Sequence, residues 1–520
     1  MKAKYLYYLP LFFLLFLLLG DSSEALAQGQ QFAVGVWCTN FQNYVTQSGG
    51  TWQIQTAEKQ RVLDLDLNYL IACTDNADVE EAIINFCEEQ NGNLKATLER
   101  RPSDSYQMWR YSYLHGNVGD PNWESEVNSG YAEIGSEFGS SVGLHSVLIG
   151  AKHNIQDPSR WDEVEFMAQS VNTNISGNPV SVTQEGWSAT NSPNFVANIP
   201  SNDIYMTGRY VFRAQPPTPN SGPNFQSAID DIVETCGGII RSIRDNNPNM
   251  DFYAIVQTQE SPPQNFNFRH PTEEEILLRV NLSLAYGAKG IVYYLYAQAG
   301  TETGLLDANR NPTSKYGEVQ NINQTYLNVH GSKFLSLDWK EGFTIHQNTQ
   351  EPISSNEGLY DVKSKPPGGS YDSESQTYVE IGYSTDSDDF DYYMVVNRRA
   401  LATETREVKI TFEGQPNAKH QVKDTFTGTV TTFSKSDVGS DGRFDYTATI
   451  APGGGKLLLL DKPPAAPLNL IITNPNQNGQ NVILAWDANI EPDLDHYAIY
   501  RGYQDDKFSP VNWLSSPVTT

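Results

Sequence analysis

The stretch FYAIVQTQESPPQNFNFRHPTEEEILLRVNLSLAYGAKGIVYYLY, residues 252–296, contains two apolar runs separated by one amphipathic segment. The runs at 252–260 and 289–296 have the length and the Tyr, Val and Ile content of buried strands. Between them, Thr272 followed by Glu275 forms a capping-box pattern, which predicts a helix that begins there. The stretch therefore predicts a strand–helix–strand unit, the building block of a parallel sheet.

The same alternation occupies most of the chain before this stretch. Six further apolar runs precede it, at 32–38, 68–74, 94–100, 145–151, 179–185 and 203–212. Amphipathic segments that predict helices lie at 78–90, 161–172, 225–246, 272–287 and 316–335. Eight strands alternating with helices over about 310 residues predict an α/β fold, a (β/α)8 TIM barrel spanning residues 28–338. A doubly wound open sheet is the alternative, but no GxGxxG or Walker loop supports it.

Near Asp338 the long helical periods stop and short alternating runs begin. The runs lie at 377–385, 391–399, 406–414, 420–433, 444–450 and 456–461. This pattern predicts an antiparallel β-sandwich over residues 339–462. Pro463, Pro464 and Pro467 then form a predicted linker into a last segment, 463–520.

The first residues of the chain have the pattern of a secretory signal peptide. Lys2 and Lys4 precede the apolar run 5–20, and Ala25-Leu26-Ala27 is a small-x-small cleavage site. The apolar run is short for a membrane span, so a membrane anchor is the weaker alternative. We therefore expect residues 1–27 to be removed and the protein to be secreted or held at the cell surface.

Composition narrows the classes of partner. The formal net charge of −27 repels phosphate backbones and argues against a nucleic-acid partner, whereas the 28 Tyr and 9 Trp suit stacking on neutral sugar rings. The four cysteines, Cys38, Cys73, Cys87 and Cys236, have no metal-type spacing, and buried free thiols are at least as good an explanation as disulfides. The sequence predicts neither a metal site nor a cofactor, and it contains no predicted membrane span after the signal peptide.

Two long stretches carry a family resemblance. RHPTEEEILLRVNLSLAYGAKGIVYYLYAQ (269–298) and GLLDANRNPTSKYGEVQNIN (304–323) resemble the last βα units of secreted glycoside-hydrolase-type barrels, akin to the β-galactosidase-like members of the retaining two-carboxylate clan. FVANIPSNDIYMTGRYVF (195–212) is similar to the preceding strand of such barrels, and APGGGKLLLLD (451–461) is similar to the last strand of their sandwich domain. The resemblance covers roughly residues 160–462. It implies carbohydrate chemistry carried by two carboxyl groups at the C-terminal ends of the strands.

A second, shorter resemblance lies near the end of the chain. NVILAWDANIEPDLDHYAIYRG (481–502) resembles the first half of a fibronectin type III domain, with Trp486 and the Tyr497–Tyr500 pair at its core aromatic positions. We therefore expect residues 463–520 to form a partial fibronectin type III-like module that spaces the protein or tethers it to a cell surface or polysaccharide.

The resemblance places the catalytic nucleophile or base at Glu260, the end of the seventh strand. The expected acid at the end of the fourth strand is missing, because Lys152, His153 and Asn154 stand there. Glu185, at the end of the fifth strand, is the alternative general acid. A structural ion pair, for example of Glu185 with Arg209, is the competing interpretation.

Strict alternation raises a question about Glu260. If Gln257 and Gln259 point into the barrel, Glu260 points outward unless the strand has ended or bulged there.

Other residues at strand ends are candidates for substrate binding. The aromatic candidates are Trp37, Trp187, Tyr210 and Tyr296, and the polar candidates are Asp75, Glu99, His153, Arg209, Gln257 and Gln259. Packing of the aromatic rings, and hydrogen bonds or ion pairs within the barrel, are the competing roles.

The sequence as a whole predicts a secreted glycoside hydrolase acting on an oligo- or polysaccharide by carboxylate acid/base chemistry. The main alternative is a non-catalytic glycan-binding or scaffold protein on a degenerate glycosidase barrel. A barrel hydrolase of another bond is the third, although neither GxSxG nor HExxH is present.

Overall fold

The computed structural model describes most of the chain. It describes residues 31–37, 39, 41–72, 76–98, 123–150, 161–184, 191–214, 221–262, 267–416 and 418–461, together with short strands at 471–473, 483–485, 498–502 and 508–513. The predicted signal peptide and proline linker, as well as Trp486 and Tyr497, lie outside the described residues. Within these ranges, no helix is long and apolar enough to cross a membrane.

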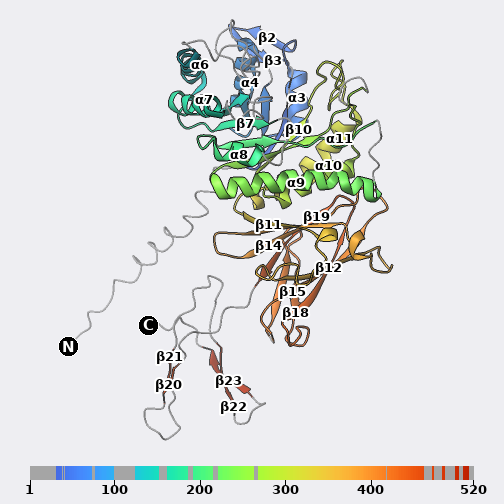
Figure 1. Ribbon diagram of the computed structural model, residues 1–520. Coiled ribbons are helices and arrows are strands. Elements are labelled where there is room, and N and C mark those ends of the chain that lie inside the picture. Colours follow the sequence, from blue (N-terminus) through green and yellow to red (C-terminus); the bar gives the residue numbers. More distant parts are fainter. Residues whose placement is uncertain are drawn as a thin grey trace, which may run out of the picture.

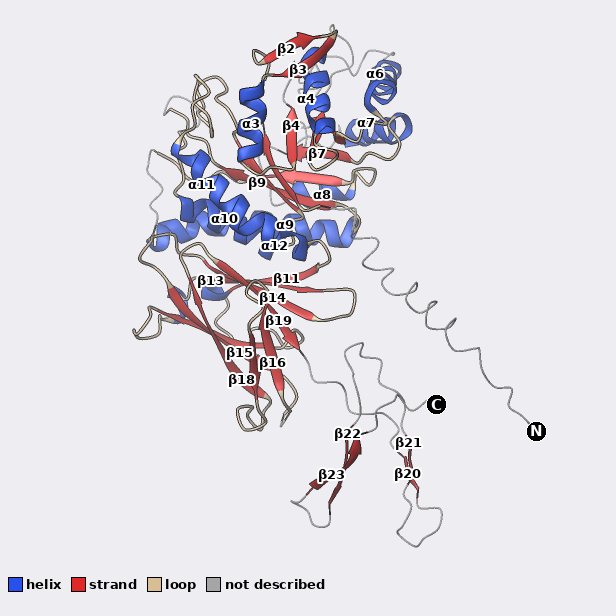
Figure 2. Ribbon diagram, turned by 180° about the vertical axis from the view of Figure 1, so that it is seen from behind, coloured by secondary structure: helices blue, strands red, loops and turns tan. Residues whose placement is uncertain are grey.

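Eight parallel strands form a closed barrel in sequence order, which confirms the predicted fold class (Figures 1 and 2). The strands are β1 (Ala33–Trp37), β4 (Tyr69–Ala72), β5 (Lys95–Leu98), β6 (Leu144–Gly150), β7 (Val180–Gln184), β8 (Ile204–Thr207), β9 (Asp251–Gln257) and β10 (Gly290–Tyr294). β1 pairs with both β4 and β10, and these pairings close the ring. The C-terminal ends of all eight strands therefore share one rim, which we call the mouth.

The barrel interior combines large and small residues on adjacent strands. Tyr69 and Tyr253 point inward and pack in one cluster with Ile255 and Val292. A Cβ atom at Gly35 would lie 2.6 Å from the Tyr69 ring, and a Cβ atom at Gly290 would lie 2.9 Å from the Tyr253 ring. Glycine at these two inward positions therefore gives the tyrosines the space that they fill.

Helices surround the barrel. They are α3 (Thr56–Asp64), α4 (Ala77–Glu89), α6 (Trp123–Phe138), α7 (Trp161–Asn174), α8 (Asn191–Ala197), α9 (Gly222–Asn246), α10 (Glu273–Ala285) and α11 (Ser314–Ile322), which continues through η2 (Asn323–Leu327), α12 (Asn328–His330) and η3 (Gly331–Phe334). The predicted capping box at the start of α10 is confirmed, because Thr272 Oγ1 accepts from the Glu275 amide and the Glu275 carboxylate accepts from the Thr272 amide. A hairpin, β2 (Val45–Ser48) and β3 (Thr51–Ile54), follows β1. The hairpin and α3, α6 and α8 are additions to the sequence prediction.

Two antiparallel sheets follow the barrel, as predicted. The larger contains β11 (Asp338–Thr344), β13 (Val379–Thr385), β14 (Asp391–Asn397), β19 (Gly455–Asp461), β16 (His420–Asp424) and β17 (Val430–Phe433), and the smaller contains β12 (Leu359–Lys365), β15 (Arg406–Glu413) and β18 (Arg443–Ile450). One apolar core, including Ile381, Ile410 and Leu458, lies between the two sheets. Of these strands, only β11 and β12 were missing from the predicted runs.

Two short antiparallel pairs follow in the last segment. They are β20 (Ile471–Thr473) with β21 (Ile483–Ala485), and β22 (Ala498–Gly502) with β23 (Phe508–Trp513). The fibronectin type III assignment of this segment stays a prediction.

A buried arginine joins the sandwich to the barrel helices. Helix α9 lies between the barrel and the six-stranded sheet (Figure 1). Arg398, which follows β14, has a side chain that is 0% exposed and pairs with Glu380 at 3.0 Å and with Asp230 of α9 at 2.5 Å. Tyr286, at the end of α10, donates its hydroxyl to the other oxygen of Glu380 at 2.6 Å. Side chains of one sheet and two barrel helices therefore meet in one hydrogen-bonded cluster.

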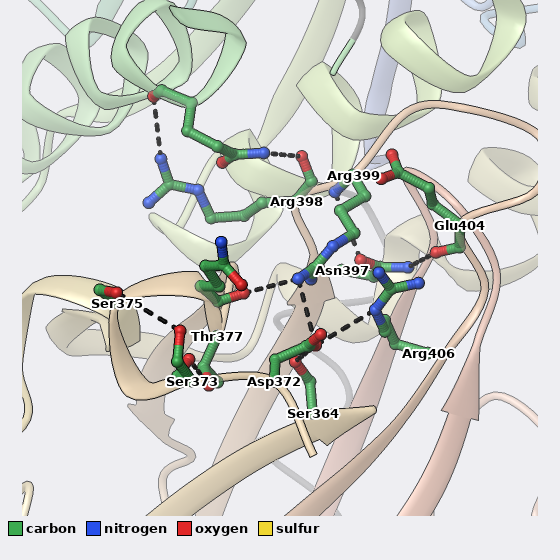
Figure 3. A network of polar contacts seen from close by, with 12 residues as sticks. Ser364, Asp372, Ser373, Ser375, Thr377, Asn397, Arg398, Arg399, Glu404 and Arg406 are labelled. Carbon is green, nitrogen blue, oxygen red and sulfur yellow. Dashed lines mark hydrogen bonds and ion pairs between the residues drawn. The ribbon is translucent and has the colours of Figure 1, made fainter. Parts of the chain in front are cut away.

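A second cluster holds the edge of the sandwich beside this one. Arg399 and Arg406 converge on the carboxylate of Asp372, while Arg398 extends in another direction (Figure 3). Ser364 of β12 also donates its hydroxyl to Asp372, at 2.6 Å. The adjacent arginines 398 and 399 thus serve two different clusters, one at the barrel and one within the sandwich.

Replacing Arg398 with Met should lower the free energy of unfolding by about 3–5 kcal/mol, because the change leaves buried carboxylates without their cation. Adding Glu380→Gln to the Met variant should recover part of the loss, since it removes one of the unpaired charges. Chemical denaturation measures both values, and Arg244→Met, at an exposed arginine, should cost less than about 1 kcal/mol. Equal losses at Arg398 and Arg244 would contradict the role of the buried cluster.

The same cluster predicts a pH dependence of stability. Burial raises the pKa of Glu380 to about 7, although Arg398 and the hydroxyls of Tyr286 and Thr344 act in the opposite direction. Between about pH 5 and 7 the folded protein therefore keeps a proton that the unfolded chain releases, so this contribution to stability declines as the pH rises through that range. Glu380→Gln should remove the decline in urea titrations across these pH values. Glu89→Gln, at an exposed carboxylate, should leave it unchanged.

Candidate active site

Aromatic side chains form part of the inner wall of the mouth. Tyr294, the last residue of β10, stacks on Tyr210 with ring centroids 5.4 Å apart and planes 23° apart. Phe268 packs edge-on against Tyr210 at 5.7 Å. Trp37, at the end of β1, belongs to the same inward-facing cluster and is 7% exposed. Of the predicted stacking residues, Trp37 and Tyr210 therefore lie at the mouth, and Tyr294 is added to them.

The polar end of β9 leaves the regular pairing of the sheet. The amides of Thr258 and Gln259 both donate to the carbonyl of Tyr294, at 2.8 and 3.2 Å, which is the hydrogen-bond pattern of a β-bulge. Glu260 then forms an isolated antiparallel bridge with Thr303. The run at 252–260 is thus a strand as far as Gln257, followed by a bulge and by a link to the loop after β10.

Glu260 lies beside a histidine that the sequence analysis did not select. The Glu260 side chain is 50% exposed, and its Oε2 atom lies 3.7 Å from Nδ1 of His270. Burial lowers the pKa of His270, and the nearby Glu260 carboxylate only partly offsets this. The imidazole is therefore neutral at neutral pH, and the contact is a polar contact between a carboxylate and a neutral ring.

A second glutamate of the described mouth comes from the loop after β10. Tyr294 donates its hydroxyl to Oε2 of Glu302 at 3.1 Å. The sequence pattern does not indicate Glu302, because no predicted strand ends directly before it. The next residue, Thr303, pairs with Glu260 at the end of β9, and this pairing brings Glu302 to the mouth.

The two glutamines after Val256 have different roles. Gln257 is fully buried and uses its amide within the protein, accepting from the Phe212 amide at 3.2 Å and donating to the Phe212 carbonyl at 3.1 Å. Gln259 is also fully buried, but neither atom of its side-chain amide has a hydrogen-bond partner among the described residues. The predicted binding role is therefore corrected for Gln257, which ties the segment after β8 to the end of β9, whereas Gln259 stays a candidate for binding hydroxyl groups.

Tyr296 does not offer a face to a ligand, contrary to the sequence-based expectation. Its side chain is 0% exposed, and the guanidinium of Arg310 lies 5.4 Å from its ring centroid. The same guanidinium contacts the ring of Tyr44 at 4.6 Å and pairs with Glu58. Tyr296 therefore packs within a clamp that holds the loop after β10 against the segment after β1.

Arg209 also differs from its predicted role. It extends to Asp231 of α9, 3.4 Å away, and both side chains are substantially exposed. The ion pair lies on the helix layer, because Asp231 belongs to α9. Arg209 is thus directed to the outside of the barrel at this point.

Five predicted site residues lie outside the described residues. They are Asp75, Glu99, His153, Glu185 and Trp187. Lys152 and Asn154, which stand where the fourth-strand acid was expected, lie outside as well.

A hollow of about 380 Å³ opens at the opposite, N-terminal end of the barrel, where Tyr69, Tyr253 and His145 line it. Polar side chains at this end bind neighbouring backbone: Asn68 accepts from the Val34 amide, and Asp203 accepts from the Val180 amide. These bonds fix the starts of the strands. These polar side chains therefore stabilise the fold at the N-terminal end of the barrel. In barrels of this kind the active site lies at the opposite, C-terminal end.

The described part of the chain holds no group of three or more His, Cys, Asp or Glu side chains arranged to bind a metal ion. Cys87 and Cys236 are buried free thiols, as the composition allowed, and burial raises the pKa of Cys236 to about 11. Neither thiol is therefore prepared to act as a nucleophile.

No family model matches the sequence, and no curated protein matches it significantly. Solved structures do match. A protein described as a glycoside hydrolase matches over 83% of this chain and 93% of its own, with a TM-score of 0.51 and 11% identity. A family 5 glycoside hydrolase from Bacteroides vulgatus ATCC 8482 covers 84% and 92%, with a TM-score of 0.49 and 10% identity. A β-galactosidase from the psychrophilic Marinomonas ef1 covers 59% and 62%, with a TM-score of 0.43 and 11% identity. The first match establishes a fold shared with a glycoside hydrolase, a (β/α)8 barrel followed by antiparallel sheets.

The contrast between the two glutamines is testable by stability alone. Gln257→Leu should lower the free energy of unfolding by about 1–3 kcal/mol, because it leaves the buried amide of Phe212 without an acceptor. Gln259→Leu should leave stability unchanged or raise it, because a buried amide without partners is replaced by an apolar side chain of similar size. Urea denaturation of the two variants in parallel gives the comparison. Equal losses would show that Gln259 is also hydrogen-bonded within the protein.

Proposed function

We propose that this protein hydrolyses O-glycosidic bonds of an oligo- or polysaccharide at the mouth of its barrel, without a cofactor. The observation that carries the proposal is the mouth itself, where the Glu302 carboxylate is bonded to Tyr294 of an aromatic wall that also contains Trp37 and Tyr210. Aromatic faces bind the apolar sides of sugar rings, and carboxyl groups supply the acid and the base that glycoside hydrolysis needs. The fold shared with glycoside hydrolases supports the same reaction class.

The sequence-based assignment gives the two catalytic roles to Glu260 and Glu185. Glu260, at the end of β9, is half-exposed and would serve as nucleophile or base. Glu185 would serve as the general acid that protonates the leaving oxygen. The two environments must differ for one carboxyl to stay ionised while the other holds its proton.

Substrate contacts would come from several strand ends. Gln259 can pair one amide donor and one acceptor with sugar hydroxyls, since the described protein leaves both unused. His153, Trp187, Asp75 and Glu99 are the further candidates. The net charge of −27 favours a neutral saccharide over a polyanion.

We also propose that the protein acts outside the cytoplasm after cleavage of residues 1–27. The segment 463–520 would then space the barrel from a cell surface or hold it to a polysaccharide. The signal-peptide pattern and the resemblance to a fibronectin module support these two statements.

A non-catalytic glycan-binding protein is the second candidate. It is favoured by Lys152, His153 and Asn154 at the predicted end of the fourth strand, where the barrels that the sequence resembles carry an acid. A protein of this kind would bind a saccharide at the aromatic wall without hydrolysing it.

A panel of aryl glycosides and of plant and marine polysaccharides tests the proposal. We expect the wild-type protein to release sugar from at least one of them, and Glu185→Gln to lower kcat by about 10²–10⁴-fold through loss of the proton donor. Released reducing ends or aryl groups give the rate. Glu341→Gln, at a barrel–sandwich ion pair with Arg241, is the control and should keep full activity.

The two candidate functions give different results in this experiment. Binding of a polysaccharide with no release of product by the wild-type protein would favour the glycan-binding function. Unchanged turnover in both Glu185→Gln and Glu260→Gln would remove the sequence-based site assignment while leaving the reaction class in place.

A further inference from the structure

The backbone of Glu302 is held on both sides by a short hairpin. Ala299 and Glu302 exchange two backbone hydrogen bonds, at 3.0 and 3.1 Å. The next residue, Thr303, exchanges two more with Glu260, both at 3.0 Å. Glu302 and the residue that follows it are therefore both paired through their backbones, so the Glu302 side chain projects from a fixed point of the loop.

The pairing also decides which way each glutamate faces. Residues opposite one another across a bridge project to the same side, and successive residues project to opposite sides. Thr303 is opposite Glu260, so Glu302 projects to the other side from Glu260. The partner of Glu260 is His270, which lies two residues before Thr272, the N-cap residue of α10.

Glu302 projects to the inner side of the barrel. Its partner Tyr294 packs against the inward-facing cluster that contains Tyr253, Ile255 and Val292. Tyr294 also stacks on Tyr210, the aromatic residue proposed to contact the sugar. A carboxylate bonded to the hydroxyl of Tyr294 therefore lies above the aromatic wall of the mouth.

We infer that Glu302 is a catalytic carboxylate of this site, held in position by the hydroxyl of Tyr294. The inference rests on the proposed hydrolysis, but it moves the role of nucleophile or base from Glu260, where the sequence-based assignment places it, to Glu302, which projects from the inner side. A hydroxyl that donates to a carboxylate favours the ionised form, which is the form needed for a nucleophile or a base. Tyr294 is a positioning residue, because it acts through Glu302.

The reaction balances with one water molecule added. The glycosidic C–O bond breaks, and the general acid gives its proton to the leaving oxygen. The carboxylate of Glu302 either bonds to the anomeric carbon and is then displaced by water, or takes a proton from the water that attacks this carbon. In the first case the acid is reprotonated by the attacking water, and in the second case the proton held by Glu302 returns to solvent as the acid is reprotonated.

The experiment compares variants on the best substrate of the glycoside panel. Glu302→Gln should lower kcat by about 10²–10⁴-fold, and azide added to Glu302→Ala should restore turnover by about tenfold or more, because a small anion replaces the lost carboxylate. Tyr294→Phe should move the acidic limb of the pH profile of kcat/KM upward by about one pH unit, since it removes the donor that favours the ionised form. Glu273→Gln, in the first turn of α10, is the matched control and should keep wild-type kinetics.

The possible results separate this inference from the proposed function. A wild-type protein that hydrolyses no member of the panel overturns the proposed reaction and the inference with it. A wild-type protein that is active, with Glu302→Gln retaining more than a tenth of the turnover, overturns the inference alone, and loss in Glu260→Gln would then assign the role to Glu260. If Glu302→Gln is folded by circular dichroism and inactive, but neither azide rescue nor the pH shift occurs, Glu302 is structural and the inference is again overturned.

Discussion

Closure of the parallel sheet is the constraint on which the rest of this structure depends. β1 must pair with β10 on one side and β4 on the other, so no strand of the ring keeps a free edge. The ring closes around Tyr69 and Tyr253, and inward glycines on the neighbouring strands give these rings their space. Because all eight strands run in the same direction, closure collects their polar C-terminal ends at one mouth. Strand ends that are distant in sequence are brought together there.

The sandwich domain supports the helices behind that mouth. Arg398 and Glu380 link the six-stranded sheet to α9 and to the end of α10. Helix α10 connects β9 to β10, the two strands whose ends carry Glu260 and Tyr294. A buried arginine with two carboxylate partners is sensitive to the loss of any one of them, which makes the geometry of this joint specific. The barrel and the sandwich thus form one physical unit on this side.

At the mouth, neighbouring residues at the end of β9 have different roles. Gln257 uses its amide to hold the segment after β8, whereas Gln259 leaves its amide unused by the described residues. Glu260 meets the neutral imidazole of His270, and Glu302, from the loop paired with it, meets a tyrosine hydroxyl on the inner side. A wall of aromatic rings with the Glu302 carboxylate bonded to one of them is the arrangement on which the proposed function rests.

By itself the amino-acid sequence determined the strands of the barrel, most strands of the sandwich and the capped start of α10. These features depend on local patterns, because burial on both faces demands a continuous apolar run and a helix start demands a side chain that satisfies free amides. Tertiary structure alone decided which polar residues face the mouth. The bulge at Thr258 and Gln259 and the bridge between Glu260 and Thr303 join segments from different βα units, so no local pattern contains them. For the same reason Glu302 was missed, and Tyr296 was assigned to a ligand although Arg310, from a later part of the loop, covers it. Alternation along one strand specifies two faces, but only the partner strand determines where that alternation ends.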